Sequence, residues 1–344
     1  MTGAHHGVLH VVDLALGQRA AFVRTLVAEG EQLVLDVGDR HAAGRQIEGP
    51  ELALGDLRQR SHPDEVHASP PRRSSFGNTT LVPELPEVET YRRFFAERAV
   101  GRTVHRVVVT DRTIVRNASA RAFARALAGR TFLQADRQGK WMLARTEGPT
   151  LLVHFGMTGD LIWSGDEPQR HRHDRVILEL VGGHELRYRN VRKLGGVWLA
   201  HDADEEREVL GDLGPDALAA GRREFVDRLS RRRGGAKALL MNQRFVAGVG
   251  NLIADEVLWQ ARIHPKRRVE SLDAADRARL FRVLRKVLTT AVQEFDYLES
   301  RPAWLNHVRG EPGARCPRCR APLARVTAAG RTTYLCPRCQ PPPA

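Results

Sequence analysis

Cys316-Pro-Arg-Cys319 and Cys336-Pro-Arg-Cys339 contain all four cysteines of this 344-residue chain, within its last 29 residues. Sixteen residues separate the two pairs. Two C-x-x-C pairs at this separation place four thiolates at the corners of a tetrahedron when a β-hairpin joins them. We therefore predict one structural Zn²⁺ ion bound by Cys316, Cys319, Cys336 and Cys339. Its binding would drive the folding of a segment too short to have its own core.

Two other interpretations of the cysteines remain open at this stage. They could form two disulfides, or one redox-active pair beside a spare pair. Residues 1–30 show no basic region followed by an apolar core, so they do not resemble a signal peptide. A reducing compartment, the cytoplasm, is therefore the expected location, and it favours zinc over disulfides.

Charge is distributed unevenly along the chain. The formal net charge is +13, but residues 1–82 contain 8 Arg and no Lys against 10 Asp and Glu, so residues 83–344 carry +15. Such a basic body indicates a polyanionic partner, most commonly nucleic acid for a cytoplasmic zinc protein. The excess of arginine over lysine can also reflect a GC-rich genome. No apolar run reaches the ~20 residues that a membrane span needs, so we expect no membrane partner.

The residue pattern changes at Pro83. Residues 1–82 contain no recognisable motif and end in a polar stretch, Ser61–Thr80, that prolines interrupt. Pro86 then suits the first turn of a helix with apolar positions at Val88, Tyr91, Phe95 and Val100. Short β-type runs follow at Val104–Val109, Trp141–Ala144, Leu151–Phe155, Val176–Leu180 and Val197–Leu199. These runs predict a β-sandwich or barrel with one leading helix.

Beyond Asp202–Arg207, an acidic segment expected to be a linker, the periodicity becomes helical. Asn251 is the expected N-cap of a helix at Leu252–Arg262, entered through the tight turn Gly248–Gly250. One stripe of a later amphipathic helix consists of Leu280, Leu284, Val287, Leu288, Ala291 and Phe295. A helical module is therefore predicted between the β domain and the zinc hairpin.

Acidic side chains lie close together in Pro83-Glu84-Leu-Pro-Glu87-Val-Glu89, at the start of the first predicted helix. A purely structural explanation is that acidic residues and proline favour helix N-termini. The segment also resembles the N-terminus of the Fpg/Nei family, the formamidopyrimidine-DNA glycosylases and endonuclease VIII enzymes, and is closer to the Fpg branch.

Further blocks follow in the family's order, and the resemblance covers about three quarters of the chain. Arg137-Gln-Gly-Lys140-Trp is similar to the family's β-hairpin lysine motif, and His154-Phe-Gly-Met157-Thr-Gly159 to its methionine loop. Met241–Glu256 resembles the helix-two-turn-helix element, and Gly330–Gln340 the terminal zinc finger.

The resemblance implies an α+β multidomain fold with an N-terminal β-sandwich and leading helix, a helix-two-turn-helix domain and a β-hairpin zinc finger. We expect a non-native or disordered extension at 1–82. The remaining divisions are a catalytic domain at 83–205, a linker at 206–225, a DNA-binding helical domain at 226–308 and the finger at 309–344.

The same resemblance implies a bifunctional DNA glycosylase and abasic-site lyase, monomeric and acting on double-stranded DNA that contains oxidised bases or abasic sites. An N-terminal proline amine, here that of Pro83, would attack the sugar C1′ and form a Schiff-base-type intermediate. Glu84 would serve in acid/base steps, Lys140 would contact phosphate and assist strand cleavage, and Glu87 would order the site. The finger residue Arg331 would support the second elimination.

Contacts to DNA are also implied by the resemblance. Met157 would fill the void that a flipped base leaves in the duplex. The other expected DNA-binding residues are His154, His173, Arg192, Lys193, Leu194, Arg232, Lys237 and Asn251. Structural alternatives exist, because Arg232 lies in a run of three arginines, and His173 and Asn251 could be ordinary hydrogen-bonded residues.

Pro83 departs from the family pattern because residues 1–82 precede it. A proline inside a chain has a tertiary amide nitrogen, which is neither basic nor nucleophilic. Val82 lies where the family has its initiator Met, and bacterial genes often start at GTG, a valine codon. We therefore hypothesise that translation starts at residue 82 and that the first 81 residues are a gene-model artefact.

Two further departures concern the substrate. The family's Asp-Pro-Arg-Arg-Phe-Gly wedge is here Asn190-Val-Arg192-Lys193-Leu194-Gly195. Lysine lacks the planar fork that reads a base edge, and leucine stacks less well than phenylalanine, so we expect weaker discrimination of the opposite base. Only about a dozen residues separate Phe295 from Val308, where the Fpg branch has a longer lesion-capping loop.

Two rival functions remain. A catalytically inactive zinc-containing paralogue that binds damaged DNA would result if the extension is retained or the site has diverged. A zinc-ribbon module of the transcription or translation machinery would explain the cysteines and the charge, but not Pro83, Lys140 or His154–Gly159.

Overall fold

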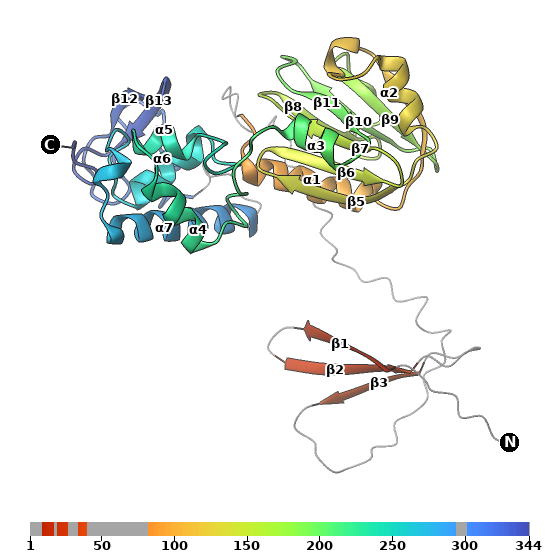
Figure 1. Cartoon of the computed structure of the whole chain (residues 1–344), viewed down its shortest axis with the longest axis horizontal. Coiled ribbons are helices and arrows are strands. Elements are labelled where there is room, and N and C mark those ends of the chain that lie inside the picture. Colours follow the sequence, from red (N-terminus) through yellow and green to blue (C-terminus); the bar gives the residue numbers. More distant parts are fainter. Residues whose placement is uncertain (1–8, 17–18, 27–33, 40–81, 294–300, 344) are drawn as a thin grey trace. The chain divides into compact units, whose positions relative to one another are not determined.

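The computed structural model describes residues 9–16, 19–26, 34–39, 82–293 and 301–343 (Figure 1). The chain divides into two units, Met1–Val66 and His67–Ala344. In the first unit, β1 (Leu9–Leu16), β2 (Arg19–Leu26) and β3 (Val34–Asp39) form an antiparallel sheet in that order. The polar stretch Ser61–Thr80 lies outside the described residues.

The second unit begins with α1 (Leu85–Ala99) and a sandwich of two antiparallel four-stranded sheets. One sheet has the order β4-β9-β10-β8 and the other β11-β7-β6-β5. Their apolar side chains share one core, which confirms the predicted β-sandwich. The strands are β4 (Val104–Val109), β5 (Phe132–Gln138), β6 (Trp141–Thr146), β7 (Thr150–His154), β8 (Gly159–Trp163), β9 (Asp174–Leu180), β10 (Glu185–Asn190) and β11 (Gly196–Ala200).

Helix α1 contributes to both cores of this unit. Val88 and Phe95 are buried in the sandwich core, as the helical spacing predicts, whereas Leu85 packs into the core of the helical domain. The first turn of α1 therefore lies at the junction of the two domains. A second helix, α2 (Ala120–Leu127), buries Phe123 and Leu127 in the sandwich core.

The acidic segment expected to be a linker begins a helix. Asp202 is the N-cap of α3 (Ala203–Leu210), and its carboxylate accepts hydrogen bonds from the N–H groups of Asp204 and Glu205. Acidic residues in a first turn stabilise a helix through its dipole. The acidic composition was therefore a helix-start signal, and the segment Asp202–Arg207 forms the N-cap and first turns of α3.

The helical domain confirms the predicted module. It contains α4 (Arg222–Ser230), α5 (Ala236–Leu240), α6 (Asn251–Gln260) and α7 (Ala274–Gln293). The predicted stripe of α7 is buried from Leu280 to Ala291, while Phe295 lies outside the described residues. Short 3₁₀ turns lie at η3 (Arg112–Ile114), η4 (Val269–Ser271) and η5 (Leu305–His307).

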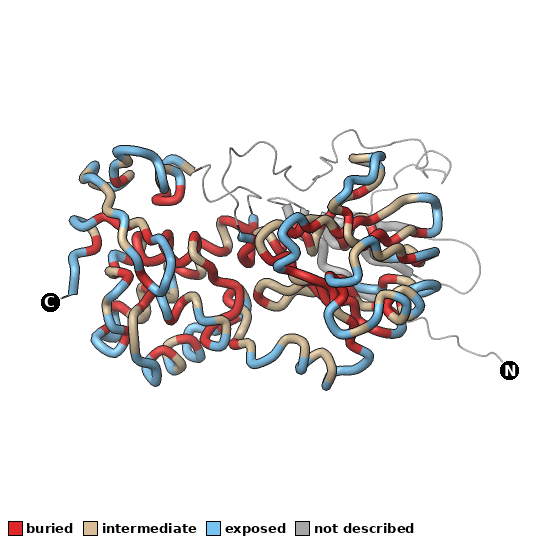
Figure 2. Tube along the Cα trace, turned by 90° about the horizontal axis from the view of Figure 1, so that it is seen from above, coloured by how far each residue is buried: buried red, intermediate tan, exposed pale blue. Residues whose placement is uncertain are grey.

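The C-terminal hairpin consists of β12 (Ala324–Ala328) and β13 (Arg331–Leu335). Beside the hairpin, Cys316 and Cys336 are buried in a small cluster with Trp259 of α6 and Leu305. Figure 2 shows buried positions gathered inside the sandwich and the helical domain, with exposed positions along the loops. Among the described residues, no helix is long and apolar enough to cross a membrane.

Candidate active site

Glu84 connects the start of α1 to the start of α6. Its buried carboxylate accepts hydrogen bonds from the N–H groups of Gly250 (2.8 Å), Leu252 (2.8 Å) and Ile253 (3.2 Å). These are orphan donors of the first turn of α6, whose dipole favours a carboxylate at this end. The predicted N-cap Asn251 is therefore wrong, because Gly250 is the N-cap and Glu84 supplies the capping oxygens.

The absence of a side chain at Gly250 makes this contact possible. A Cβ at Gly250 would lie 2.2 Å from Cδ and 2.3 Å from Oε1 of Glu84. Nearby, Gly248 has φ +108°, its carbonyl accepts the Leu85 N–H at 3.0 Å, and a Cβ there would meet Leu85. The two glycines of the predicted tight turn, Gly248 and Gly250, therefore allow the N-terminus of α1 to pack closely against them.

We expect Gly250→Ala to lower the free energy of unfolding by about 3 kcal/mol, from overpacking and the loss of buried hydrogen bonds. Gly221→Ala is the matched control, since Gly221 is the N-cap of α4 and a Cβ there would meet nothing within 4 Å. The control should change stability by less than about 1 kcal/mol. Denaturant unfolding checks both, and equal losses would contradict the role of Gly250.

The β5–β6 turn that contains Lys140 is held by contacts to α1 and to the segment before the helical domain. The N–H of Gly139 donates to Oδ2 of Asp216 at 2.7 Å, and the Arg137 guanidinium pairs with Asp216 as well as with Glu89 of α1, the latter at 3.1 Å. Asp216 lies in the segment between α3 and α4. Glu89, Arg137 and Asp216 therefore join α1, the β5–β6 turn and the segment that leads into the helical domain.

The pKa values of Glu84, Glu87 and Lys140 are shifted by burial and by one another's charges. Burial lowers the pKa of Lys140, with Arg331 acting in the same direction, while Glu84 and Glu87 oppose the shift. Burial and the negative charge of Glu84 raise the pKa of Glu87 to about 7. Burial also raises the pKa of Glu84, against the attraction of Lys140 and the three N–H donors. Strongly shifted groups of this kind gather at catalytic sites.

Glu87 also completes the start of α1. Its Oε2 accepts the Glu84 N–H at 2.8 Å, so Glu84 and Glu87 form a capping box. The main chain around Glu84 is held from within α1, and its side chain is held by α6. Pro83, the residue before Glu84, is buried.

His154 lies at the end of β7, opposite Trp141 across the strand pair. The two ring centroids are 4.9 Å apart, and Nδ1 of His154 accepts the Gly156 N–H at 3.2 Å. Burial and the charge of Lys140 lower the pKa of His154 to about 4. The ring is therefore neutral at neutral pH and carries its proton on Nε2.

The methionine loop and the wedge loop form one surface. Oδ1 of the buried Asn190 accepts hydrogen bonds from the Thr158 hydroxyl (3.0 Å) and the Lys193 N–H (2.8 Å). Gly156 and Gly195 meet so closely that a Cβ on Gly156 would lie 2.3 Å from the Gly195 nitrogen. Asn190 therefore holds the loop of Met157 against the loop of Arg192–Leu194, although sequence reasoning gave it no role.

The wedge loop exposes apolar side chains. Leu194 is 55% exposed and Val191 49%, and Arg192 is also exposed. Lys193 has φ +54° and forms an ion pair with Asp111 at 3.0 Å. Leu194 is therefore an exposed apolar residue on the loop that packs against Gly156, the neighbour of Met157. The Lys193 ammonium, by contrast, is paired with Asp111 of the sandwich domain.

The remaining predicted DNA contacts are dispersed. His173 lies between Arg172 and Arg175, which are hydrogen-bonded to its ring nitrogens. Arg232 is exposed after α4, and Asn251 donates to the Thr332 carbonyl of the finger at 3.3 Å.

The Lys237 ammonium is fully buried and pairs with Asp255 at 2.7 Å. This argues against the expected phosphate contact, because the ion pair would have to open for Lys237 to reach DNA.

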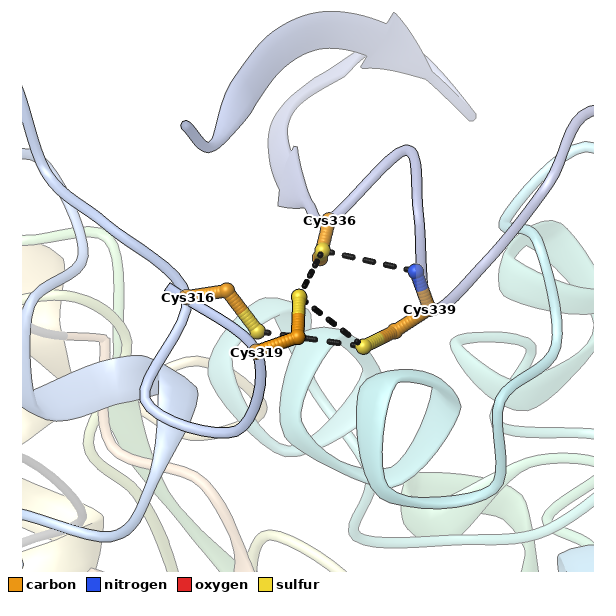
Figure 3. A group of neighbouring side chains, drawn as sticks. All are labelled: Cys316, Cys319, Cys336 and Cys339. Carbon is orange, nitrogen blue, oxygen red and sulfur yellow. Dashed lines mark hydrogen bonds between the residues drawn. The ribbon is translucent and has the colours of Figure 1, made fainter. Parts of the chain in front are cut away.

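The four cysteines converge as predicted (Figure 3). All four Sγ atoms lie within 4.8 Å of one another, and the closest pairs are 3.4, 3.5 and 3.9 Å apart. Disulfide sulfurs lie about 2.05 Å apart, whereas sulfurs around a tetrahedral zinc with Zn–S bonds of about 2.3 Å lie about 3.8 Å apart. The geometry fits one structural Zn²⁺ with no position left open for catalysis. Trp259 Nε1 donates to Cys316 Sγ at 3.3 Å and links the centre to α6.

Three family models match consecutive parts of the chain. They are the formamidopyrimidine-DNA glycosylase N-terminal domain at residues 82–197, the formamidopyrimidine-DNA glycosylase H2TH domain at 213–299, and the zinc finger found in FPG and IleRS at 313–342. The chain belongs to the formamidopyrimidine-DNA glycosylase family.

Curated members of the formamidopyrimidine-DNA glycosylase family match about three quarters of the chain. The protein of that name from Symbiobacterium thermophilum is 39% identical over 287 residues, which cover 76% of this chain and 90% of the relative. The one from Herpetosiphon aurantiacus is 38% identical over 278 residues, covering 75% of this chain and all of the relative.

Solved structures of the family show the same fold. Lactococcus lactis Fpg, in a complex with DNA containing an abasic site, is 28% identical, with a TM-score of 0.69. The match covers 75% of this chain and 100% of that one. A complex of an inhibited form of the same enzyme with DNA containing N7-benzyl-Fapy-dG has the same identity and TM-score.

Proposed function

We propose that this chain, when its backbone begins at Pro83, is a bifunctional DNA glycosylase and abasic-site lyase that removes oxidised bases from double-stranded DNA. One observation carries the proposal. Pro83 directly precedes Glu84, and the charges of Glu84 and of the finger residue Arg331 both act on the ammonium of Lys140. Family relatives named formamidopyrimidine-DNA glycosylase, and a relative bound to abasic-site DNA, support the same assignment.

The chemistry requires a free secondary amine at Pro83. Its nitrogen lone pair forms a bond to the sugar C1′, while the C1′–N bond to the base breaks. The base leaves with that electron pair and takes up a proton. The C1′–O4′ bond then breaks, O4′ takes up a proton, and the nitrogen, having lost its own proton, is left as an iminium.

Strand cleavage follows from the iminium. Loss of a C2′ proton breaks the C3′–O bond, and loss of a C4′ proton in a second step breaks the C5′–O bond. Water then hydrolyses the imine and regenerates the amine. We assign acid/base steps at the sugar to Glu84, ordering of the site to Glu87, proton transfer and a phosphate contact to Lys140, and support of the second elimination to Arg331.

The proposed DNA surface combines the two joined loops with basic residues. Met157 and Leu194 would occupy the space that the flipped base leaves, with Arg192 and Lys193 beside them. His154, His173, Arg232 and Asn251 would contact the phosphate backbone without reading sequence. We propose that the protein binds DNA as a monomer, with zinc holding the finger that presents Arg331.

The N-terminal segment decides whether the amine exists. In the full chain Val82 is joined to Pro83, so the Pro83 nitrogen is an amide. We propose that the active form starts at residue 82 and loses that residue. The part from Pro83 onward contains both large cores and all four cysteines, and relatives match it over 90 to 100% of their own length.

Protein beginning at Pro83 is expected to form a covalent adduct with abasic-site DNA when borohydride reduces the iminium. The full chain should form none, because an amide nitrogen has no available lone pair. Gel electrophoresis of the reduced mixture measures the adduct. Lack of an adduct from the Pro83 form, with DNA binding retained, would instead favour the inactive damaged-DNA-binding paralogue.

A further inference from the structure

Asp255 is a buried carboxylate in the second turn of α6 that joins three other segments. Its side chain is 0% exposed. Oδ1 lies 2.7 Å from Nζ of Lys237, and Oδ2 lies 3.3 Å from Nη2 of Arg309. Oδ2 also accepts the Tyr334 N–H of β13 at 3.3 Å. One carboxylate therefore binds α5, the loop after η5 and the finger strand.

The partners of Asp255 hold the same strand at neighbouring residues. Lys237 Nζ donates to the Thr333 hydroxyl at 2.6 Å, and that hydroxyl donates to the Arg331 carbonyl at 3.1 Å. Arg309 donates to the Thr332 carbonyl at 3.1 Å, and its guanidinium lies 5.0 Å from the Tyr334 ring centroid. The main chain that follows Arg331 is thus bound by the network at Arg331, Thr332 and Tyr334.

Helix α6 gives this network a fixed relation to the candidate active site. The N-terminus of α6 holds the Glu84 carboxylate, and Trp259 near its C-terminus touches the cysteine cluster. A helix of 10 residues is about 15 Å long and stiff on that scale. Asp255 lies between these two ends. One rigid helix, α6, therefore contacts the Glu84 carboxylate, the finger strand β13 and the cysteine cluster.

We propose that the Lys237–Asp255–Arg309 network is a positioning device that holds Arg331 over the site of the second elimination. The inference rests on the proposed function and extends it to residues that do not touch the substrate. A buried ion pair adds little net stability, because desolvation offsets its attraction, but it does select one geometry. The zinc centre holds the opposite end of the hairpin and leaves the orientation of Arg331 to these contacts.

The test uses protein beginning at Pro83 and two variants. Asp255→Asn keeps the side-chain size but leaves Lys237 and Arg309 without their counter-charge. Thr333→Val keeps that ion pair and removes only the hydroxyl between Lys237 and the strand. If Asp255→Asn fails to fold, Thr333→Val still tests the inference, because it changes no charge.

We expect both variants to lower the ratio of second- to first-elimination product by about 10- to 100-fold, the effect of misplacing a reacting group by about 1 Å. Borohydride trapping and zinc content should equal those of the parent. In an Arg331→Ala background neither variant should reduce the ratio further. Asp227→Asn, which changes an exposed carboxylate of α4, is the matched control.

Amide hydrogen exchange gives a readout that needs no activity. The Tyr334 N–H should exchange faster in Asp255→Asn than in the parent or in Asp227→Asn. An unchanged product ratio in Thr333→Val, or a further loss in the Arg331→Ala background, would overturn the inference. If the parent formed no adduct with abasic-site DNA, the proposed function would be contradicted. Exchange of the Tyr334 N–H would still decide whether the Lys237–Asp255–Arg309 network holds strand β13.

Discussion

Glu84→Gln, in protein beginning at Pro83, is expected to slow release of an oxidised base by about 10²- to 10⁴-fold, the range typical of losing a general acid or base. Glutamine keeps the length of the side chain but cannot exchange a proton with the sugar. Its NH₂ group would also face the N–H donors of Gly250, Leu252 and Ile253, where only oxygens can accept. The variant therefore loses both the proton carrier and part of the α6 cap.

Base release from a lesion-containing duplex, followed under single-turnover conditions, measures this effect. Trapping on preformed abasic-site DNA should persist, because the Pro83 amine is unchanged and no base has to leave. Glu224→Gln, at an exposed position in the first turn of α4, is the control and should release base at the parent rate. Release by Glu84→Gln at the parent rate would exclude Glu84 from the acid/base steps.

Cys336→Ser is expected to abolish zinc binding and, with it, the second elimination step. Structural zinc supplies on the order of 10 kcal/mol to the folding of a finger. Cys336 is fully buried beside Trp259 and Leu305, so its loss also opens the contact between the finger and α6. Without the folded hairpin, Arg331 has no fixed position and the DNA loses one set of phosphate contacts.

Zinc content by atomic absorption and DNA affinity by titration check this prediction. Affinity should fall while the sandwich and its core stay folded, since that core contains none of the four cysteines. Thr327→Ser, an exposed change in β12, should retain one zinc per chain. Full DNA affinity and cleavage in zinc-free Cys336→Ser would show that the finger is dispensable.

Local patterns in the sequence determined much of the fold. The C-x-x-C spacing predicted the metal site, and the apolar spacing after Pro86 predicted α1. Val104–Val109 was predicted with the bounds that β4 has. These signals depend on side chains a few residues apart, so a single stretch of chain contains them.

Strand β10 shows why other elements escaped prediction. Glu185–Asn190 carries Glu185, Arg187 and Arg189 among its six residues, a poor strand pattern by polarity. In the sandwich, Arg187 is fully buried and pairs with Glu185, and Arg189 pairs with Asp174 of β9. Buried charge is tolerated only where partners exist, and a partner on another strand is invisible to local pattern.

The candidate site divides in the same way. The residues predicted for it are recognisable by motif, but their arrangement depends on contacts that no motif records. Glu84 is held by backbone N–H groups 166 to 169 residues away, and every residue except proline has such a group. Asp216 and Asp255 bind turns and strands that only folding brings to them. The sequence by itself determined which chemistry this chain can carry, and tertiary structure alone decided how Glu84, Lys140 and Arg331 are held together, because long-range packing sets the distances between them.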